Sequence, residues 1–148
     1  MQIGYGKMSG CAVAAMSAVA EQHQAGVALN SADIAKLRNL SQPLVAKVMV
    51  SLSMAGYITG TRGPGGGYRL AKAPETIRIY DIVSVFEGVE SELECPFGPG
   101  YCGHHTPCPM HETLATLQLG YVQELKRCRL DMFAKPANRS DQPVGENI

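Results

Sequence analysis

The sequence has no tryptophan, no net charge and no long hydrophobic run. A membrane-spanning helix needs about 18 or more consecutive apolar residues, and the 148 residues contain no such stretch. The opening residues MQIGYGKMSG also lack the apolar core of a secretory signal peptide. We therefore expect a cytoplasmic protein with no membrane association, long enough to bury the core of one domain.

The zero net charge conceals opposite charges in the two halves of the chain. Residues 1–72 carry seven Lys or Arg and two acids, which gives +5. Residues 73–148 carry six Lys or Arg and eleven acids, which gives −5. A charge asymmetry of this kind indicates that the first half lies on the phosphates of a nucleic acid while the second half faces away from them.

The number of cysteines is odd, which argues against a disulfide framework in a reducing compartment. Three of the five, Cys95, Cys102 and Cys108, fall within fourteen residues of one another. Such crowding favours metal binding or redox chemistry. The other two, Cys11 and Cys128, lie in helical patterns, and we interpret them as small buried hydrophobic residues.

The first half contains a helix followed by a pair of shorter helices. The Ala-rich segment 7–24 has apolar residues at helical spacing and no proline. In the first helix of the pair, Asn30 or Ser31 can cap the beginning while Ile34 and Leu37 face inward. This spacing is compatible with a helix-turn-helix and, equally, with two ordinary packed helices.

The second helix of the pair is expected over residues 41–55. Ser41 can cap it, and Pro43 fits its first turn, where no backbone donor is needed. Gly56 can close it. Its buried stripe is expected to contain three apolar residues, Leu44, Val48 and Leu52.

A glycine-rich hairpin follows this helix directly. Tyr57–Thr59 are strand formers, Arg62–Gly67 reads RGPGGG and cannot be helical, and Tyr68–Leu70 returns as a strand. The order helix, helix, hairpin predicts a winged helix. A phosphate-binding nucleotide loop is excluded because the glycines are not followed by Gly-Lys-Ser or Gly-Lys-Thr.

The predicted fold is therefore mainly α with a small β-hairpin wing: a winged helix-turn-helix plus a long dimerisation helix. A short helix over 76–87 completes a DNA-binding domain over residues 1–87. Residues 88–110 form a cysteine-rich loop, 111–135 the dimerisation helix, and 136–148 a disordered polar tail.

The predicted dimerisation helix carries an apolar stripe with spacings of 3, 4, 4, 3 and 4 residues, which places it on one helical face. The stripe consists of Leu114, Leu117, Tyr121, Leu125, Cys128 and Met132. It can pack against the domain's own core or against a second copy. We favour a homodimer because helix-turn-helix proteins usually bind paired half-sites.

The cysteine loop has the spacing C-x6-C-x5-C-x2-H, ending at His111. Three thiolates and an imidazole can hold an iron–sulfur cluster, since one His can replace a Cys. Zinc accepts the same donors but usually shows a tighter Cys pair, and a reversible disulfide switch is the third reading. His104 and His105 are also near, but we interpret them as exposed loop residues. A small electron-transfer protein is a further alternative.

No pattern indicates an enzyme. An enzyme would need a cleft with an acid–base pair, and the carboxylates near the fourth helix, Asp81 and Glu87, are interpreted as surface charges. We therefore predict a binding protein. We also expect the cysteine loop, which follows the winged domain and precedes the long helix, to lie between these two modules.

Together these residues resemble the IscR/NsrR-type (Rrf2) family of bacterial winged-helix regulators. The resemblance rests on Ala12–Met16, the helix pair from Ser31 to Gly56, Arg62–Tyr68 and the three-cysteine loop. It implies a homodimeric transcription regulator bound to a double-stranded DNA operator. Operator affinity would be controlled by an iron–sulfur cluster that senses redox state, nitric oxide or iron–sulfur status.

The resemblance also implies a ligand set. In the iron–sulfur-homeostasis branch, a Cys-x2-His ending supplies a His ligand to a 2Fe–2S cluster, and Cys108-Pro-Met-His111 is similar. In the nitric-oxide-sensing branch an early Asp completes a 4Fe–4S cluster, whereas the first acid here is Glu21. We therefore prefer 2Fe–2S held by Cys95, Cys102, Cys108 and His111, with 4Fe–4S possible and zinc as the alternative metal.

For DNA, the resemblance makes residues 41–55 the recognition helix in the major groove. Four of its residues would face bases and phosphates: Ser41, Gln42, Pro43 and Lys47. Arg62 of the wing would enter the minor groove. The wing residues Gly65, Gly66 and Tyr68 would let the backbone approach the DNA closely.

Overall fold

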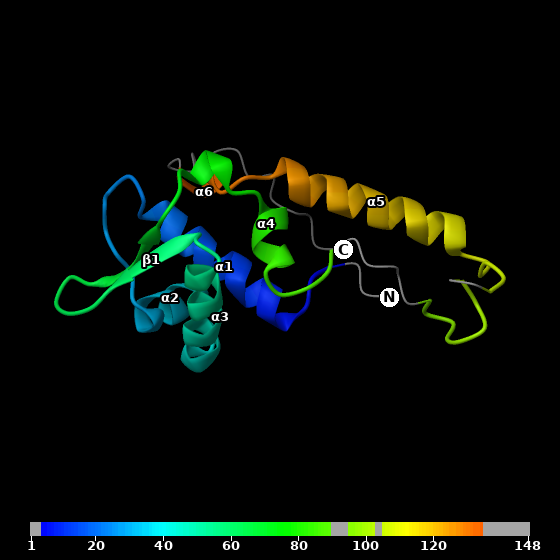
Figure 1. Cartoon of the computed structure of the whole chain (residues 1–148), viewed down its shortest axis with the longest axis horizontal. Helices are drawn as coiled ribbons and strands as arrows, with labels where there is room; N and C mark the ends of the chain where they lie inside the picture. The colour runs from blue at the N-terminus through cyan, green and yellow to red at the C-terminus, as the bar shows by residue number, and fades with distance from the viewer. Residues whose placement is uncertain (1–3, 90–94, 103–104, 135–148) are drawn as a thin grey trace, which may run out of the picture.

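The structure is a computed structural model that describes residues 4–89, 95–102 and 105–134 (Figure 1). Its elements follow in chain order: α1 (Lys7–Glu21), α2 (Ser31–Arg38), α3 (Gln42–Met54), β1 (Ile58–Thr61), β2 (Gly67–Leu70), η1 (Pro74–Thr76), α4 (Ile79–Ser84), α5 (His111–Arg127) and α6 (Asp131–Ala134). The predicted fold, mainly α with one two-stranded hairpin, is confirmed.

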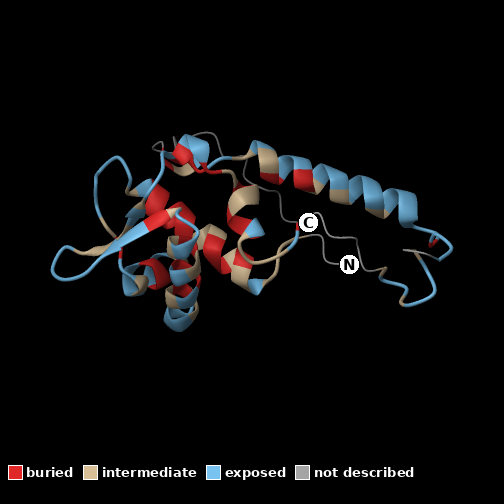
Figure 2. Cartoon of the chain, in the orientation of Figure 1, coloured by how far each residue is buried: buried red, intermediate tan, exposed pale blue. Residues whose placement is uncertain are grey.

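Helix α1 is the centre of the core, and α2, α3, α4 and α6 pack around it. Its alanines explain this position, because their small side chains let neighbouring helices approach closely. Ala12, Ala15 and Met16 are fully buried, and Figure 2 shows the buried residues gathered on α1 and the elements around it. None of the described helices is long and apolar enough to cross a membrane.

Helix α2 begins at the predicted cap. The Asn30 side chain accepts a hydrogen bond from the Asp33 backbone N–H (2.8 Å), and the Asp33 carboxylate accepts one from the Asn30 N–H (3.3 Å). Ile34 is buried as predicted, but Leu37 is 53% exposed, so its inward assignment is wrong. The buried face centres on Ile34 and Ala35, and Leu37 lies about 200° around the helix from Ala35.

Helix α3 begins at Gln42 with Pro43 in its first turn. Ser41 is the N-cap residue as predicted, but its side chain makes no capping hydrogen bond. Val48 and Leu52 are buried as predicted. Leu44 is only half-buried, since the core-facing side centres on Val45 and Met49. Gly56, with φ of +85°, follows the C-cap residue and turns the chain into the wing.

The wing is an antiparallel pair in which Ile58 faces Leu70 and Thr61 faces Gly67. A third segment holds it to the domain, because Tyr68 N–H donates to Leu29 C=O (2.7 Å) and Leu29 N–H donates to Tyr68 C=O (3.2 Å). Gly67 allows this approach, since a Cβ there would lie 2.6 Å from the Leu29 carbonyl carbon. The wing is therefore fixed relative to the beginning of α2.

Replacing Gly67 with alanine should lower the free energy of unfolding by about 2–4 kcal/mol. The residue has φ of +138°, and the added methyl would collide with the backbone of Leu29. Urea denaturation followed by circular dichroism measures the loss. The matched control is Gly65→Ala, because Gly65 also has positive φ (+73°) but open space around it, and it should cost about 1 kcal/mol. Equal losses for the two variants would refute the close-approach argument.

The C-terminal helices differ from the prediction in extent. The helix predicted over 76–87 is shortened to α4, with η1 just before it, and the one predicted over 111–135 ends at Arg127. Tertiary pairing explains this end. Cys128 is extended, its carbonyl accepts from Ile79 N–H (2.9 Å), and Leu130 N–H donates to Ile77 C=O (3.0 Å). This pairing buries Leu130 fully, and α6 then packs on α1. The predicted tail, 136–148, lies outside the described residues.

Helix α5 projects away from the winged domain and contacts it near its C-terminal end (Figure 1). Val122 and Leu125 are buried there, whereas most of the helix is exposed (Figure 2). The Tyr5 and Tyr121 rings lie 6.5 Å apart, and Gln118 donates to the Val89 carbonyl (3.1 Å). The wing and the cysteine loop consequently lie at opposite ends of the molecule.

Candidate functional site

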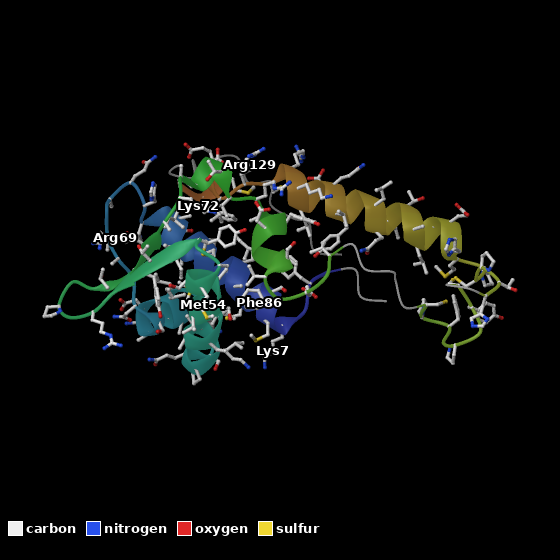
Figure 3. All side chains as sticks on the ribbon, viewed as in Figure 1. Lys7, Met54, Arg69, Lys72, Phe86 and Arg129 are labelled. Carbon is white, nitrogen blue, oxygen red and sulfur yellow. The ribbon has the colours of Figure 1, made fainter. Side chains whose placement is uncertain are left out.

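The three predicted cysteines are brought together by the loop before α5. The Sγ atoms of Cys95, Cys102 and Cys108 all lie within 4.8 Å of one another. Cys108 is buried, and the other two are half-buried. Figure 3 shows side-chain sulfur atoms gathered in the region of the loop before α5. Three thiols at this separation can bind one metal centre together.

Cys102 is the centre of this group. Its backbone has φ of +60°, a conformation that is rare for residues other than glycine. Local hydrogen bonds hold it there: Cys102 N–H donates to Thr106 C=O, and His105 N–H donates to Cys102 C=O, both at 2.8 Å. The Cys102 sulfur in turn accepts from Cys108 N–H at 3.4 Å. Sequence reasoning missed Thr106, because no pattern marks a residue that acts only through its carbonyl.

His111 is the histidine that the described structure brings to the cysteines. Its Nδ1 lies 3.4 Å from the Cys102 sulfur, and it is the first residue of α5. His105 is exposed and touches Cys102 only through the backbone, as expected for a loop residue. His104 lies outside the described residues. A donor set of three sulfurs and one imidazole nitrogen is thus assembled at one place.

The loop shifts the pKa values of Cys102 and Cys108 in opposite directions. The Cys108 N–H bond, followed by the His111 interaction, lowers the pKa of Cys102 to about 7. Burial raises the pKa of Cys108 above its ordinary value. Hydrogen bonds to sulfur stabilise thiolate, which is the form that binds a metal.

The expected position of this loop between the two modules is wrong for a single chain. The loop is at the end of α5 that is remote from the winged domain (Figure 1). The cause is the direction of α5, whose C-terminal end docks onto α4 while its beginning points outward. Within one chain, the cysteine loop and the wing are therefore separated by the length of α5 (Figure 1).

The predicted DNA-contacting residues lie on α3 and the wing. Four on α3 are exposed: Ser41, Gln42, Pro43 and Lys47. Arg62 and Gly65 are exposed in the wing, whereas Gly66 and Tyr68 are half-buried. Tyr68 has a structural role, since its backbone pairs with Leu29 and its ring lies across Gly60.

Arg62 differs from the other arginines of the described segments. Arg38, Arg78 and Arg127 form ion pairs, and Arg69 and Arg129 donate to backbone carbonyls. Arg69 joins the wing to the loop after α1, where Figure 3 labels it. Among the described arginines, Arg62 alone has no partner, and it lines a polar hollow between the wing and the beginning of α2. Its guanidinium is free for a ligand.

Comparison with known proteins assigns this architecture. The profile of the Rrf2 family, described as an iron-dependent transcriptional regulator, matches residues 6–136. An HTH-type transcriptional regulator of Neisseria meningitidis (NMA1593) is 30% identical over 130 residues, which cover 88% of this chain and 86% of that protein. The chain belongs to the Rrf2 family. Members of this family are described as transcriptional regulators rather than enzymes.

One relative and one solved structure carry the IscR name. The regulator IscR of Cereibacter sphaeroides is 39% identical over 56 residues, which are 38% of this chain and 36% of that protein. The matches to this regulator and to three other curated relatives span only 36–56% of the relative's own length. The solved structure of T. potens IscR has the same fold, with a TM-score of 0.69, 22% identity, and coverage of 96% of this chain and 93% of that one.

The carboxylates near α4 have structural contacts. Asp81 forms an ion pair with Arg78 (2.7 Å), which lowers its pKa against the opposing effect of burial. Glu87 accepts from Gly6 N–H (2.9 Å) and so holds the beginning of α1. Both carboxylates are half-buried rather than simple surface charges.

Proposed function

We propose that this Rrf2 regulator controls its affinity for an operator through an iron–sulfur cluster held by Cys95, Cys102, Cys108 and His111. The observation that carries the proposal is the assembly of three thiols within 4.8 Å, with His111 Nδ1 3.4 Å from the central sulfur. A bound 2Fe–2S cluster would supply a group whose charge and integrity change with redox state and with reactive small molecules.

Zinc is the second candidate, and one observation favours it. Four thiolates or imidazoles around a tetrahedral zinc are about 3.8 Å apart, because metal–sulfur bonds are about 2.3 Å long. The three sulfurs, all within 4.8 Å of one another, are close to this spacing. A cluster with two or more irons needs the sulfurs further apart. Gly98 and Gly100, both with positive φ, give the loop the freedom to open.

The regulator is proposed to act as a homodimer through α5. Leu117 is 48% exposed on this helix, Leu114 on the same face is half-buried, and Met110 just before the helix is 45% exposed. Among the described residues of this projecting helix, only Val122 and Leu125 are buried, so packing against its own domain gives the helix little stability. A second copy that covers these leucines would stabilise it and would place two α3 helices on paired half-sites.

His111 links the cysteines to this dimer helix because it belongs to both. Binding by His111 would fix the first turn of α5 against the loop, and its release would free that turn. Since α5 meets the winged domain through Gln118 and Tyr121, a change at its beginning alters the spacing of the two α3 helices. Two half-sites about one DNA turn apart make affinity sensitive to that spacing.

The direct test compares one DNA fragment with the protein in two states. The fragment is selected from a random-sequence library by anaerobically purified protein. We expect its affinity to change by about tenfold or more after the metal is removed with a chelator. Fluorescence anisotropy at fixed salt measures both states. The same affinity in both would contradict control by the metal.

Arg62→Ala should weaken DNA binding by about tenfold and reduce the slope of log K against log salt by about one. The reason is the loss of a free guanidinium at the wing. The matched control is Arg127→Ala, which removes the same charge from a residue paired with Glu124 on α5. Equal effects of the two variants would refute the wing assignment.

A further inference from the structure

We propose that the α3 surface reads adenine–thymine pairs in the major groove, with Gln42 on adenine and an apolar stripe on thymine methyl groups. This inference rests on the proposed function, in which α3 is the helix that enters the groove. It adds the chemical identity of the bases. Its support is the free amide and the apolar side chains that α3 presents, and the absence of a carboxylate or an arginine from α3.

Gln42 is the group suited to adenine. It is the first residue of α3, it is exposed, and its amide makes no hydrogen bond with any residue in the described ranges. An amide offers one acceptor and one donor side by side. Adenine presents the complementary pair in the major groove, the N6 donor and the N7 acceptor. Gln42 therefore has both a free functional group and the position to use it.

The composition of α3 argues against reading of G·C pairs. Its sequence QPLVAKVMVSLSM contains no carboxylate and no arginine. The N4 donor of cytosine would therefore find no charged acceptor on this helix, and guanine would find no forked guanidinium. Lys47 is the one charged side chain of α3 that could donate to guanine, and it lies more than a turn beyond Gln42, where its ammonium can bind a phosphate instead.

An apolar stripe lies beside Gln42. Pro43 is exposed, Ala46 is half-buried, and Val50 is 55% exposed. Their spacings of 3 and 4 residues place them on one face of α3, next to Lys47. Sequence reasoning missed Ala46 and Val50, although their helical spacing from Pro43 could have identified them. The C5-methyl of thymine is the apolar feature of the major groove, and this stripe matches it.

The wing points independently to the same base pairs. Arg62 is the partnerless arginine of the described structure, and it lies on a hairpin whose glycines keep the tip thin. An inserted arginine is attracted most strongly by the narrow minor groove of A·T tracts. A half-site read by α3 and by Arg62 should therefore be rich in A·T pairs in both grooves.

The test begins with sites selected from a random-sequence library by the wild-type dimer and by two variants. Gln42→Ala removes the amide, and Gln42→Glu replaces it with an acceptor suited to cytosine. Gln24→Glu is the matched control for the charge change, because Gln24 is exposed after α1, away from α3. We expect wild type and control to select adenine at the contacted position, and Gln42→Glu to select cytosine there.

Two modified sites then identify the atoms. Replacing the contacted adenine with 7-deazaadenine removes N7 and should weaken wild-type binding about fivefold or more, while leaving Gln42→Ala unaffected. Replacing the neighbouring thymine with deoxyuridine removes one methyl and should cost about fourfold.

The outcomes separate the inference from the proposed function. Selection of G·C pairs at these positions, or an equal 7-deaza effect on wild type and Gln42→Ala, would overturn the adenine contact while leaving DNA binding intact. Failure of the wild-type protein to enrich any sequence would overturn the proposed function and the inference together.

Discussion

Replacing Cys102 with alanine is expected to abolish metal binding and with it the control of DNA affinity. Cys102 is the central thiol: it lies within 4.8 Å of the other two sulfurs, accepts from Cys108 N–H and contacts His111. With it removed, two thiols and a histidine remain, too few to complete a site of four protein donors. Iron, sulfide and zinc analysis after anaerobic purification measures the loss.

Cys128→Ala is the control for this experiment. Cys128 is also half-buried, but it follows the last residue of α5, at the end of the helix opposite to the loop. This variant should keep the metal content of the wild type. Loss of metal from both variants, or from neither, would contradict the ligand set.

Replacing Leu114 and Leu117 together with glutamate should convert the dimer to monomers and weaken operator binding by about 100-fold or more. Leu114 is half-buried and Leu117 is 48% exposed on the same face of α5, and charges there would have to be buried in the proposed dimer interface. Affinity for the operator then falls because each half-site binds one monomer separately, without the higher effective concentration that a linked second subunit provides. Sedimentation velocity reports the assembly, and fluorescence anisotropy reports the binding.

The control is Gln123→Glu, a charge added at an exposed polar position of the same helix. This variant should remain dimeric. If the doubly substituted protein also remained dimeric and bound its operator as tightly as wild type, the leucines of α5 would not be the interface.

The parts of the fold that followed from the sequence are those determined by local chemistry. Asn30 and Asp33 form a capping box because the two side chains are three residues apart, whatever the rest of the fold does. The run from Arg62 to Gly67 is a turn because its one proline and four glycines exclude a helix. Arg62 and Gln42 were predicted as DNA contacts for the same reason: both are polar residues at positions outside the apolar pattern of the core, and both are exposed.

Features that depend on distant contacts were not predictable in this way. The apolar pattern continues past Arg127, but the chain leaves the helix there because residues 128–130 pair with residues 77–79. The direction of α5 is set by the contacts of Tyr121 and Gln118 with segments far away in sequence. That direction places the cysteine loop at the remote end of the molecule, a position that chain order alone could not reveal.

The central claim is that the three cysteines and His111 hold an iron–sulfur cluster, and metal content tests it most directly. Iron, acid-labile sulfide and zinc should be measured on protein purified without oxygen, together with the visible absorbance. The account predicts brown protein with iron and sulfide in equal amounts and little zinc. Colourless protein with one zinc per chain and no sulfide would contradict it and would establish the second candidate.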